Sequence, residues 1–308
     1  MAHQYNDLGR IGVKIHPLGR AFPALVRRML TLPEWIMAGN ANYMLAKRFD
    51  RQTAEAMRAA FEEATQDATE KAGKQAVTVM REMVQSEALP PEEKTFTRLK
   101  NDAQIFIGAG METTGRTLAV TLYHILANAV VHHKLREELK PAMLNGTSEV
   151  PPLAALETLP YLTAVLTEGI RIAHGTCGRL ARIAPEEDLF YHGIKIPRGA
   201  TMSQSSYLLH TDPTVFPEPL AFRPERFLGS QAAEAQKHMV PFGRGTRMCP
   251  GINLAWAELY LTIAVLVTSV RMELVDTTLR DATVDSEYFI GCLPVDSKGI
   301  RVRILGRA

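Results

Sequence analysis

The feature that most constrains this chain is a single cysteine, Cys249, placed between a glycine-rich loop and an apolar segment. Gly243, Gly245 and Gly251 allow backbone turns and close approaches that other residues exclude. Residues 252–267 are expected to form a helix whose N-terminal amides point back toward the sulfur, which favours a thiolate. A thiolate is a strong ligand for a soft metal. The loop alone leaves two interpretations open: an inert cysteine packed at a helix start, or a ligand of a metal or cofactor.

Composition excludes several classes of protein. The chain has 308 residues, enough for a sizeable core, and a formal net charge of +2, which gives no nucleic-acid footprint. Its three cysteines, Cys177, Cys249 and Cys292, are far apart, so neither a disulfide framework nor a structural zinc site is indicated. The N-terminal segment has no apolar run of the kind found in signal peptides or membrane anchors.

The residue pattern predicts a mainly α fold with a minor β-sheet. Proline, glycine and capping signals place the boundaries between elements. Helices are expected as short pieces within 20–48 and as longer elements at 52–87, about 96–132 and about 161–173. Short strands are expected at 189–191, 193–199, 201–207 and 301–305.

Inside the second long helix, three glycines need an explanation. Gly108, Gly110 and Gly115 each cost about 1 kcal/mol relative to alanine in a helix interior. Close packing against another helix is one explanation. The other is a flat ligand lying against a locally opened turn, where Thr113 can bond to the preceding turn and Glu112 supplies a titratable group.

Glu168 and Arg171 are three residues apart in the helix expected at about 161–173 and therefore share a face. An exposed pair of this kind is common and contributes little to stability. The neighbouring residues here are apolar, which indicates a partly buried pair. A buried pair needs further hydrogen bonds to be tolerated.

The pattern Phe242-x-x-Gly245-x-Arg247-x-Cys249-x-Gly251 resembles the cysteine-ligand loop of the cytochrome P-450 family, the haem-thiolate monooxygenases. The resemblance implies that Cys249 is the axial ligand of the iron of haem b, where the sulfur favours O–O cleavage. It also implies that Gly245 belongs to the cofactor-binding loop and that Arg247 reaches a haem propionate. Phe242 would pack near the sulfur, and Gly251 would permit close contact between helix and haem.

Three further matches lie in the expected order along the chain. Residues 109–114 resemble the family's oxygen-activating helix, which implies that Glu112 and Thr113 are the catalytic pair that relays protons to bound oxygen. Arg182 matches a second propionate-binding basic position.

The third match is structural. Arg226 stands in a Pro-Glu-Arg-Phe element and, with Glu168 and Arg171, resembles the family's Glu-Arg-Arg network. The resemblance implies that this network locks the loop before the cysteine.

The implied reaction inserts one atom of O2 into a small lipophilic organic substrate. Electrons would come from NADPH through a flavoprotein reductase docking near Lys237, Arg244 and Arg247. No nucleic-acid partner is expected. The residues around the motifs are similar to those of filamentous-fungal members of the family, which implies a place in fungal secondary metabolism. Full-length members are expected in the endoplasmic reticulum membrane.

The chain also departs from the family pattern. Members are usually longer, begin with a membrane anchor and carry a Trp-x-x-x-Arg helix, yet neither Trp35 nor Trp256 is followed by arginine four positions later. We therefore expect 1–308 to be a single P-450 domain truncated at its N-terminal side, with a cysteine loop at 241–251. Such a chain is expected to retain haem weakly and to turn over little. Two alternatives stay open: a haem-binding protein without catalysis, and an inactive truncated fragment.

Overall fold

The computed structural model describes Arg28, Trp35, Ile36 and Gly39, and residues 41–66, 78–143, 150–287 and 289–307. Most of the segment expected to form short helical pieces therefore lies outside the described residues. The chain divides into two compact units, Met1–Glu112 and Thr113–Ala308.

The first unit contains α3 (Ala41–Gln66), α4 (Val79–Gln85), the short 3-10 helix η1 (Pro91–Glu93) and the first part of α5 (Phe96–Ala127). The prediction of one continuous helix over 52–87 is wrong in its C-terminal part, where α4 is a separate helix. Thr78 has extended backbone, and its side chain accepts a hydrogen bond from the Arg81 amide at 3.2 Å, so it begins a separate helix.

The core of the first unit lies between α3 and the start of α5. Met57 and Leu99 are completely buried there. Asp50 of α3 pairs with Lys100 of α5, with 2.6 Å between Oδ1 and Nζ, and also accepts a hydrogen bond from Gln104. These polar contacts fix which face of α5 packs against α3.

Asn128 ends α5 earlier than the sequence predicts. Its side-chain oxygen accepts the amides of Val130 and Val131 at 3.1 and 3.2 Å, and thereby caps α6 (Ala129–Met143). The predicted helix over 96–132 is thus two helices.

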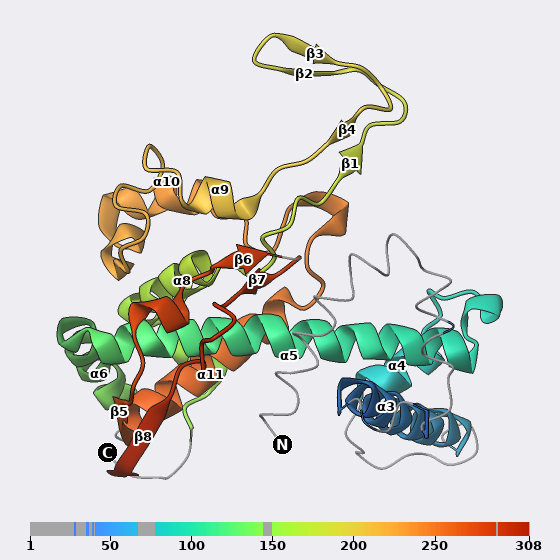
Figure 1. Cartoon of the computed structure of the whole chain (residues 1–308), viewed down its shortest axis with the longest axis horizontal. Helices are drawn as coiled ribbons and strands as arrows, with labels where there is room; N and C mark the ends of the chain where they lie inside the picture. The colour runs from blue at the N-terminus through green and yellow to red at the C-terminus, as the bar shows by residue number, and fades with distance from the viewer. Residues whose placement is uncertain are drawn as a thin grey trace. The chain divides into compact units, whose positions relative to one another are not determined.

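The core of the second unit is built from the end of α5, α6, α8 (Pro160–Ala173) and α11 (Ile252–Ser269) (Figure 1). The bounds of α8 agree with the helix predicted at about 161–173, and almost all of its residues are buried. Glu138 of α6 accepts the amides of Tyr161 and Leu162 at 2.8 and 2.7 Å. A carboxylate at this end satisfies orphan amides and complements the helix dipole.

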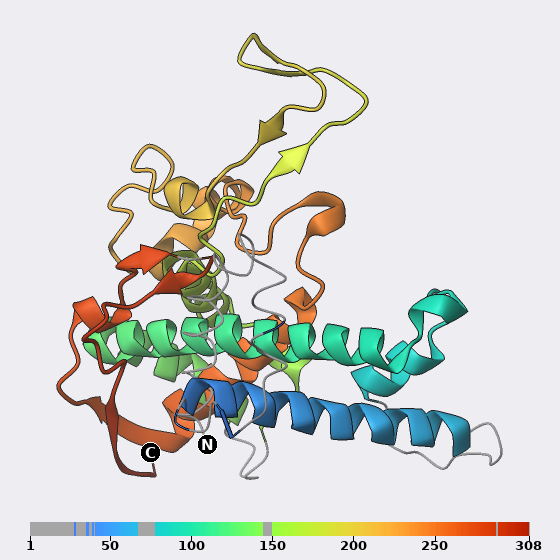
Figure 2. The same cartoon turned by 45° about the vertical axis from the view of Figure 1, so that its right-hand side comes forward.

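Strands β1 (Arg182–Ile183), β2 (Leu189–Tyr191), β3 (Ile194–Ile196) and β4 (Thr201–Met202) form an arm that extends from the second unit (Figures 1 and 2). β2 and β3 pair in antiparallel fashion through a turn in which His192 and Gly193 both have positive φ. This backbone matches the twist of a two-residue hairpin. The strand predicted over 201–207 is only partly correct, because α9 (Ser206–His210) begins at Ser206.

Within the described residues, the strands form four two-stranded antiparallel sheets. β5 (Val270–Leu274) pairs with β8 (Val302–Arg307), which agrees with the strand predicted at 301–305. The remaining elements are α7 (Leu153–Leu156), α10 (Ala232–Lys237), β6 (Ser286–Glu287), β7 (Gly291–Cys292), and the 3-10 helices η2 (Pro224–Phe227), η3 (Gly229–Gln231), η4 (Gly245–Arg247) and η5 (Leu279–Ala282).

Among the described helices, α11 alone has the length and apolar composition needed to cross a bilayer. It also supplies Leu259, Ile263 and Val267 to the buried core of its unit. A core helix meets the same criterion, so this observation is weak evidence for a membrane span.

Candidate functional site

The cysteine loop, residues 241–251, is closed by its own backbone. The Cys249 amide donates to the Phe242 carbonyl at 2.8 Å, and the Met248 amide donates to the Gly245 carbonyl at 3.1 Å. Gly243 and Gly245 have φ values of 69° and 75°. Because side chains disfavour this backbone region, the two glycines are what allow the loop to turn back on itself.

Cys249 lies at the base of this loop, just before α11. Gly251 is the residue preceding the first helical residue, and a Cβ placed there would lie 3.9 Å from the Cys249 sulfur. The thiol is half-buried and forms no disulfide. Arg247 is exposed on the same loop. Phe242 packs toward Trp256 of α11, with 6.4 Å between ring centroids.

The donor set of this loop fits haem. Within the described residues, no group of three or more His, Cys, Asp or Glu could hold a metal ion. A single half-buried thiol suits a metal whose other donors come from a macrocycle. Apolar Met248 and Leu254, which flank Cys249 in sequence, are exposed, and exposed Arg247 suits a carboxylate.

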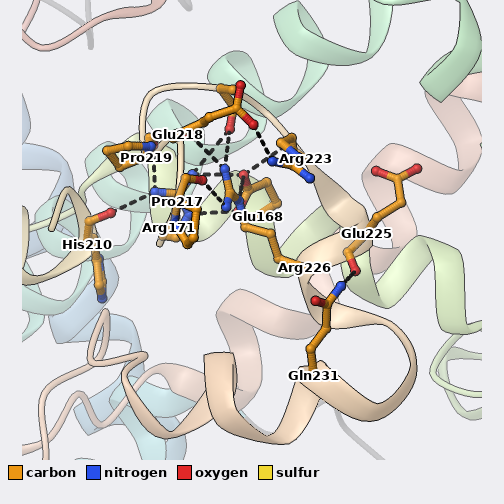
Figure 3. A network of polar contacts seen from close by, with 11 residues as sticks. Glu168, Arg171, His210, Pro217, Glu218, Pro219, Arg223, Glu225, Arg226 and Gln231 are labelled. Atoms are coloured by element: carbon orange, nitrogen blue, oxygen red, sulfur yellow. Dashed lines mark hydrogen bonds and ion pairs between the residues drawn. The ribbon is translucent and has the colours of Figure 1, made fainter. Parts of the chain in front are cut away.

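Glu168, Arg171 and Arg226 are brought together as a buried network (Figure 3). Arg171 donates to both oxygens of Glu168, at 2.7 and 2.8 Å, and both side chains are 0% exposed. Arg226 Nε donates to Glu168 at 3.2 Å, and the Arg223 amide donates to the same oxygen at 2.9 Å. Both carboxylate oxygens therefore accept hydrogen bonds, which is the condition under which a buried ion pair is tolerated.

The two guanidinium groups also hold the segment that leads toward the cysteine loop. Arg171 Nη1 donates to the carbonyls of His210 and Pro219, at 2.7 and 2.8 Å. Arg226 donates to the carbonyls of Pro217 and Glu218. Arg171 of α8 and Arg226 of η2 together hold an irregular stretch that has little secondary structure of its own (Figure 3).

Glu112 and Thr113 are neighbours in α5, where the helix remains regular. The Thr113 carbonyl accepts the hydroxyl of Thr117 at 2.9 Å. Apart from the adjoining backbone of α5 itself, no atom of the described residues lies within 4 Å of a Cβ added at Gly108, Gly110 or Gly115. Among the described residues, no other helix packs closely against these three glycines, and the helix is regular at this turn.

Arg182 makes no recorded contact with the cysteine loop among the described residues. It lies on β1, is exposed, and donates to the neighbouring Ala181 carbonyl at 3.0 Å. No contact among the described residues joins its side chain to Arg247.

Sequence reasoning missed His210. Its ring accepts the Val240 amide at 3.1 Å, and its carbonyl is one of the acceptors of Arg171. The available signal was the segment His210-Thr211-Asp212-Pro213, in which the histidine directly precedes turn-forming residues. Its partners are backbone groups, which no side-chain pattern reveals.

The sequence is similar to those of known proteins. The sequence model for Cytochrome P450 matches residues 20–290. The chain is 44% identical over 322 residues to the cytochrome P450 monooxygenase ucsK of Acremonium sp, covering 99% of this chain and 61% of that protein. It is 45% identical to the cytochrome P450 monooxygenase pbrB of Penicillium brasilianum, covering 63% of this chain and 38% of the relative.

A third relative has a named reaction. The chain is 40% identical to the N-acetyltryptophan 6-hydroxylase ivoC of Emericella nidulans over 72% of this chain and 44% of that protein. The chain thus spans less than two thirds of the length of each of these relatives. The match over most of its residues, together with the mainly α architecture, shows that the chain belongs to the cytochrome P450 family.

Proposed function

We propose that the chain carries the haem-binding core of a haem-thiolate monooxygenase, with Cys249 as the axial ligand of haem b. The observation that carries this proposal is the closed cysteine loop, in which the Cys249 amide bonds to the Phe242 carbonyl directly before α11. The monooxygenase names of the fungal relatives support the reaction class.

When bound, haem iron supplies the activation of O2, so that R–H, O2, two electrons and two protons give R–OH and water. Cys249 contributes the sulfur donor, Gly251 leaves the space beside the sulfur without a side chain, and Gly243 and Gly245 allow the loop to turn. Arg247 binds a propionate through its guanidinium group. Arg182, on β1, is proposed as a second propionate partner.

Glu112 and Thr113 are proposed to hold and pass protons, at the Glu112 carboxyl and the Thr113 hydroxyl. Their adjacent positions in α5 support this role. Glu168, Arg171 and Arg226 have a structural role in this proposal, which their burial supports.

The proposed substrate is a small lipophilic organic molecule, and the proposed electron source is an NADPH-dependent flavoprotein reductase. Lys237, Arg244 and Arg247 are exposed near the cysteine loop and supply positive charge for docking. The proposed site of action is the endoplasmic reticulum membrane, in fungal secondary metabolism.

The test is optical. The 308-residue chain is loaded with excess haem, reduced and exposed to carbon monoxide, and the strongly red-shifted Soret band of thiolate ligation is expected. Cys249→Ser should abolish that band. Cys292→Ser is the matched control, because Cys292 is also half-buried and forms no disulfide, and this variant should keep the band.

Buried Cys177 is a poor competitor for the iron, since burial raises the pKa of its thiol to about 11. A thiolate band that survives Cys249→Ser would refute the assignment. Haem binding without substrate-coupled consumption of NADPH would instead indicate a haem protein without catalysis.

A further inference from the structure

His210 connects two parts of the second unit that are distant in sequence. Its carbonyl accepts Nη1 of Arg171 at 2.7 Å, and its ring Nε2 accepts the amide of Val240 at 3.1 Å. The side chain is 1% exposed, at the last residue of α9. The same residue thus contacts the Glu168–Arg171–Arg226 network through its backbone and the approach to the cysteine loop through its ring.

Val240 passes the contact on to the cysteine. The Val240 carbonyl accepts the Gly243 amide at 3.1 Å, which forms the first turn of the loop. Phe242, inside that turn, accepts the Cys249 amide. The ring of His210 therefore binds the amide of Val240, whose carbonyl accepts the first hydrogen bond of the cysteine loop.

The form of the imidazole follows from its partner. A backbone amide can only donate, so Nε2 must present a lone pair, and a neutral ring then carries its proton on Nδ1. Burial, followed by the nearby charge of Arg171, lowers the pKa of His210 to about 4. The ring centroid lies 6.2 Å from that of Phe216, at 87° between planes, an edge-to-face arrangement that aromatic rings favour.

We propose that His210 is a positioning residue for Cys249, which fixes the cysteine loop against the Glu168–Arg171–Arg226 network through the Val240 amide. The arginines of the network donate hydrogen bonds to backbone carbonyls within residues 210–221. The hydrogen bond between the His210 ring and the Val240 amide connects this segment to the cysteine loop. The expected effect of His210 on iron ligation by Cys249 rests on the function proposed above. Its effect on the order of the cysteine loop does not depend on that function.

The test measures amide hydrogen exchange by mass spectrometry on the 308-residue chain without added haem. In His210→Phe, which keeps a ring but removes the acceptor, peptides covering 240–249 should exchange roughly tenfold faster, as for loss of one buried hydrogen bond. His210→Gln places an oxygen near the position of Nε2 and should restore most of the protection. His210→Asn is too short to reach and should resemble His210→Phe.

His124→Phe is the matched control. His124 is also buried, at 8% exposure, but it stacks on Phe222 with 4.6 Å between centroids. This variant should leave exchange at 240–249 unchanged. Unchanged exchange at 240–249 in a folded His210→Phe chain would overturn the proposal. So would faster exchange spread evenly over α6 and α11. If His210→Phe fails to fold, equal exchange in the Gln and Asn variants would overturn it instead.

A second readout uses the haem-loaded chain. His210→Phe should lower the fraction of the reduced, carbon monoxide-bound chain that shows the thiolate band, and His210→Gln should restore that fraction. If the unsubstituted chain shows no thiolate band, the proposed function fails, while the exchange result still decides the role of His210. If the band is present and His210→Phe leaves both readouts unchanged, only the positioning role fails.

Discussion

The hydroxyl of Tyr260 donates to the hydroxyl of Thr163 at 2.7 Å and joins α11 to α8. The direction follows because Thr163 has one hydroxyl proton, which it donates to the Leu159 carbonyl at 2.9 Å. Tyr260 is 5% exposed, so the bond lies inside the core. The helix that begins after the cysteine loop is therefore tied by a polar contact to the helix that carries Glu168 and Arg171.

Removing this hydroxyl should weaken the second unit modestly. Tyr260→Phe is expected to lower the free energy of unfolding by about 1 kcal/mol, because it leaves Thr163 without its donor and changes little in volume. Urea unfolding measures the change. In a double-mutant cycle with Thr163→Val, the two effects should not add, and strict additivity would show that the contact contributes nothing.

Arg171→Ala should have a much larger effect. It leaves the carboxylate of Glu168 buried with fewer partners, and breaking such a pair costs about 3–5 kcal/mol. Loss of soluble protein, or a large fall in the urea midpoint, is the expected result. Arg223→Ala is the control, since its side chain pairs with Glu218 at the surface and such pairs contribute at most about 1 kcal/mol. Soluble Arg171→Ala protein as stable as Arg223→Ala would contradict a structural role.

Gly169 should not tolerate a side chain. A Cβ there would lie 2.0 Å from Oγ1 of Thr121, which is completely buried in α5. Gly169→Ala is therefore expected to destabilise the chain by about 1–3 kcal/mol, and Thr121→Ala should recover part of the loss. Gly115→Ala has open space and should instead stabilise the helix by up to about 1 kcal/mol. Thermal unfolding of Gly169→Ala, of Gly169→Ala combined with Thr121→Ala, and of Gly115→Ala checks the order, and a neutral Gly169→Ala would contradict the close approach of α5 and α8.

Acid should destabilise the second unit through its buried histidines. Burial is the main cause that lowers the pKa of His124, His174 and His210 from 6.5 to about 4, 3 and 4. As the pH falls through 6.5, the unfolded chain takes up these protons before the folded chain does. Stability is therefore constant above about pH 7 and falls toward pH 4, by about 2 kcal/mol per histidine between pH 7.5 and 5.

Urea unfolding at pH 7.5, 6 and 5 measures this dependence. His124→Phe removes one of the three groups and should flatten the dependence accordingly. The same slope in this variant would show that His124 titrates normally.

The parts of the fold that follow from side-chain patterns could be predicted. The helix at about 161–173 was confirmed because proline marks its start and its apolar faces are continuous. The turns at Gly243 and Gly245 were indicated because glycine is the residue that such backbone requires. The overall class, mainly helical with small strands, was confirmed as well.

The errors have a common physical cause. Thr78 and Asn128 end or divide predicted helices by bonding to backbone amides, although both residues are also compatible with a helix interior. The acceptors of Arg171 at His210 and Pro219 are carbonyls, which every residue has. A sequence indicates that a buried arginine needs hydrogen-bond acceptors. Which backbone carbonyls serve as acceptors depends on the path of the folded chain.

The hydrogen bond from Arg171 to the His210 carbonyl closes a loop whose ends are 39 residues apart in sequence. The arm of β1 to β4 lies wholly inside this closed loop and extends away from its base (Figure 2). Loop closure becomes harder only slowly with length, by roughly 0.6 kcal/mol per doubling. The turn at His192 is therefore a place where evolution can lengthen, shorten or exchange the tip of the arm while the base stays fixed.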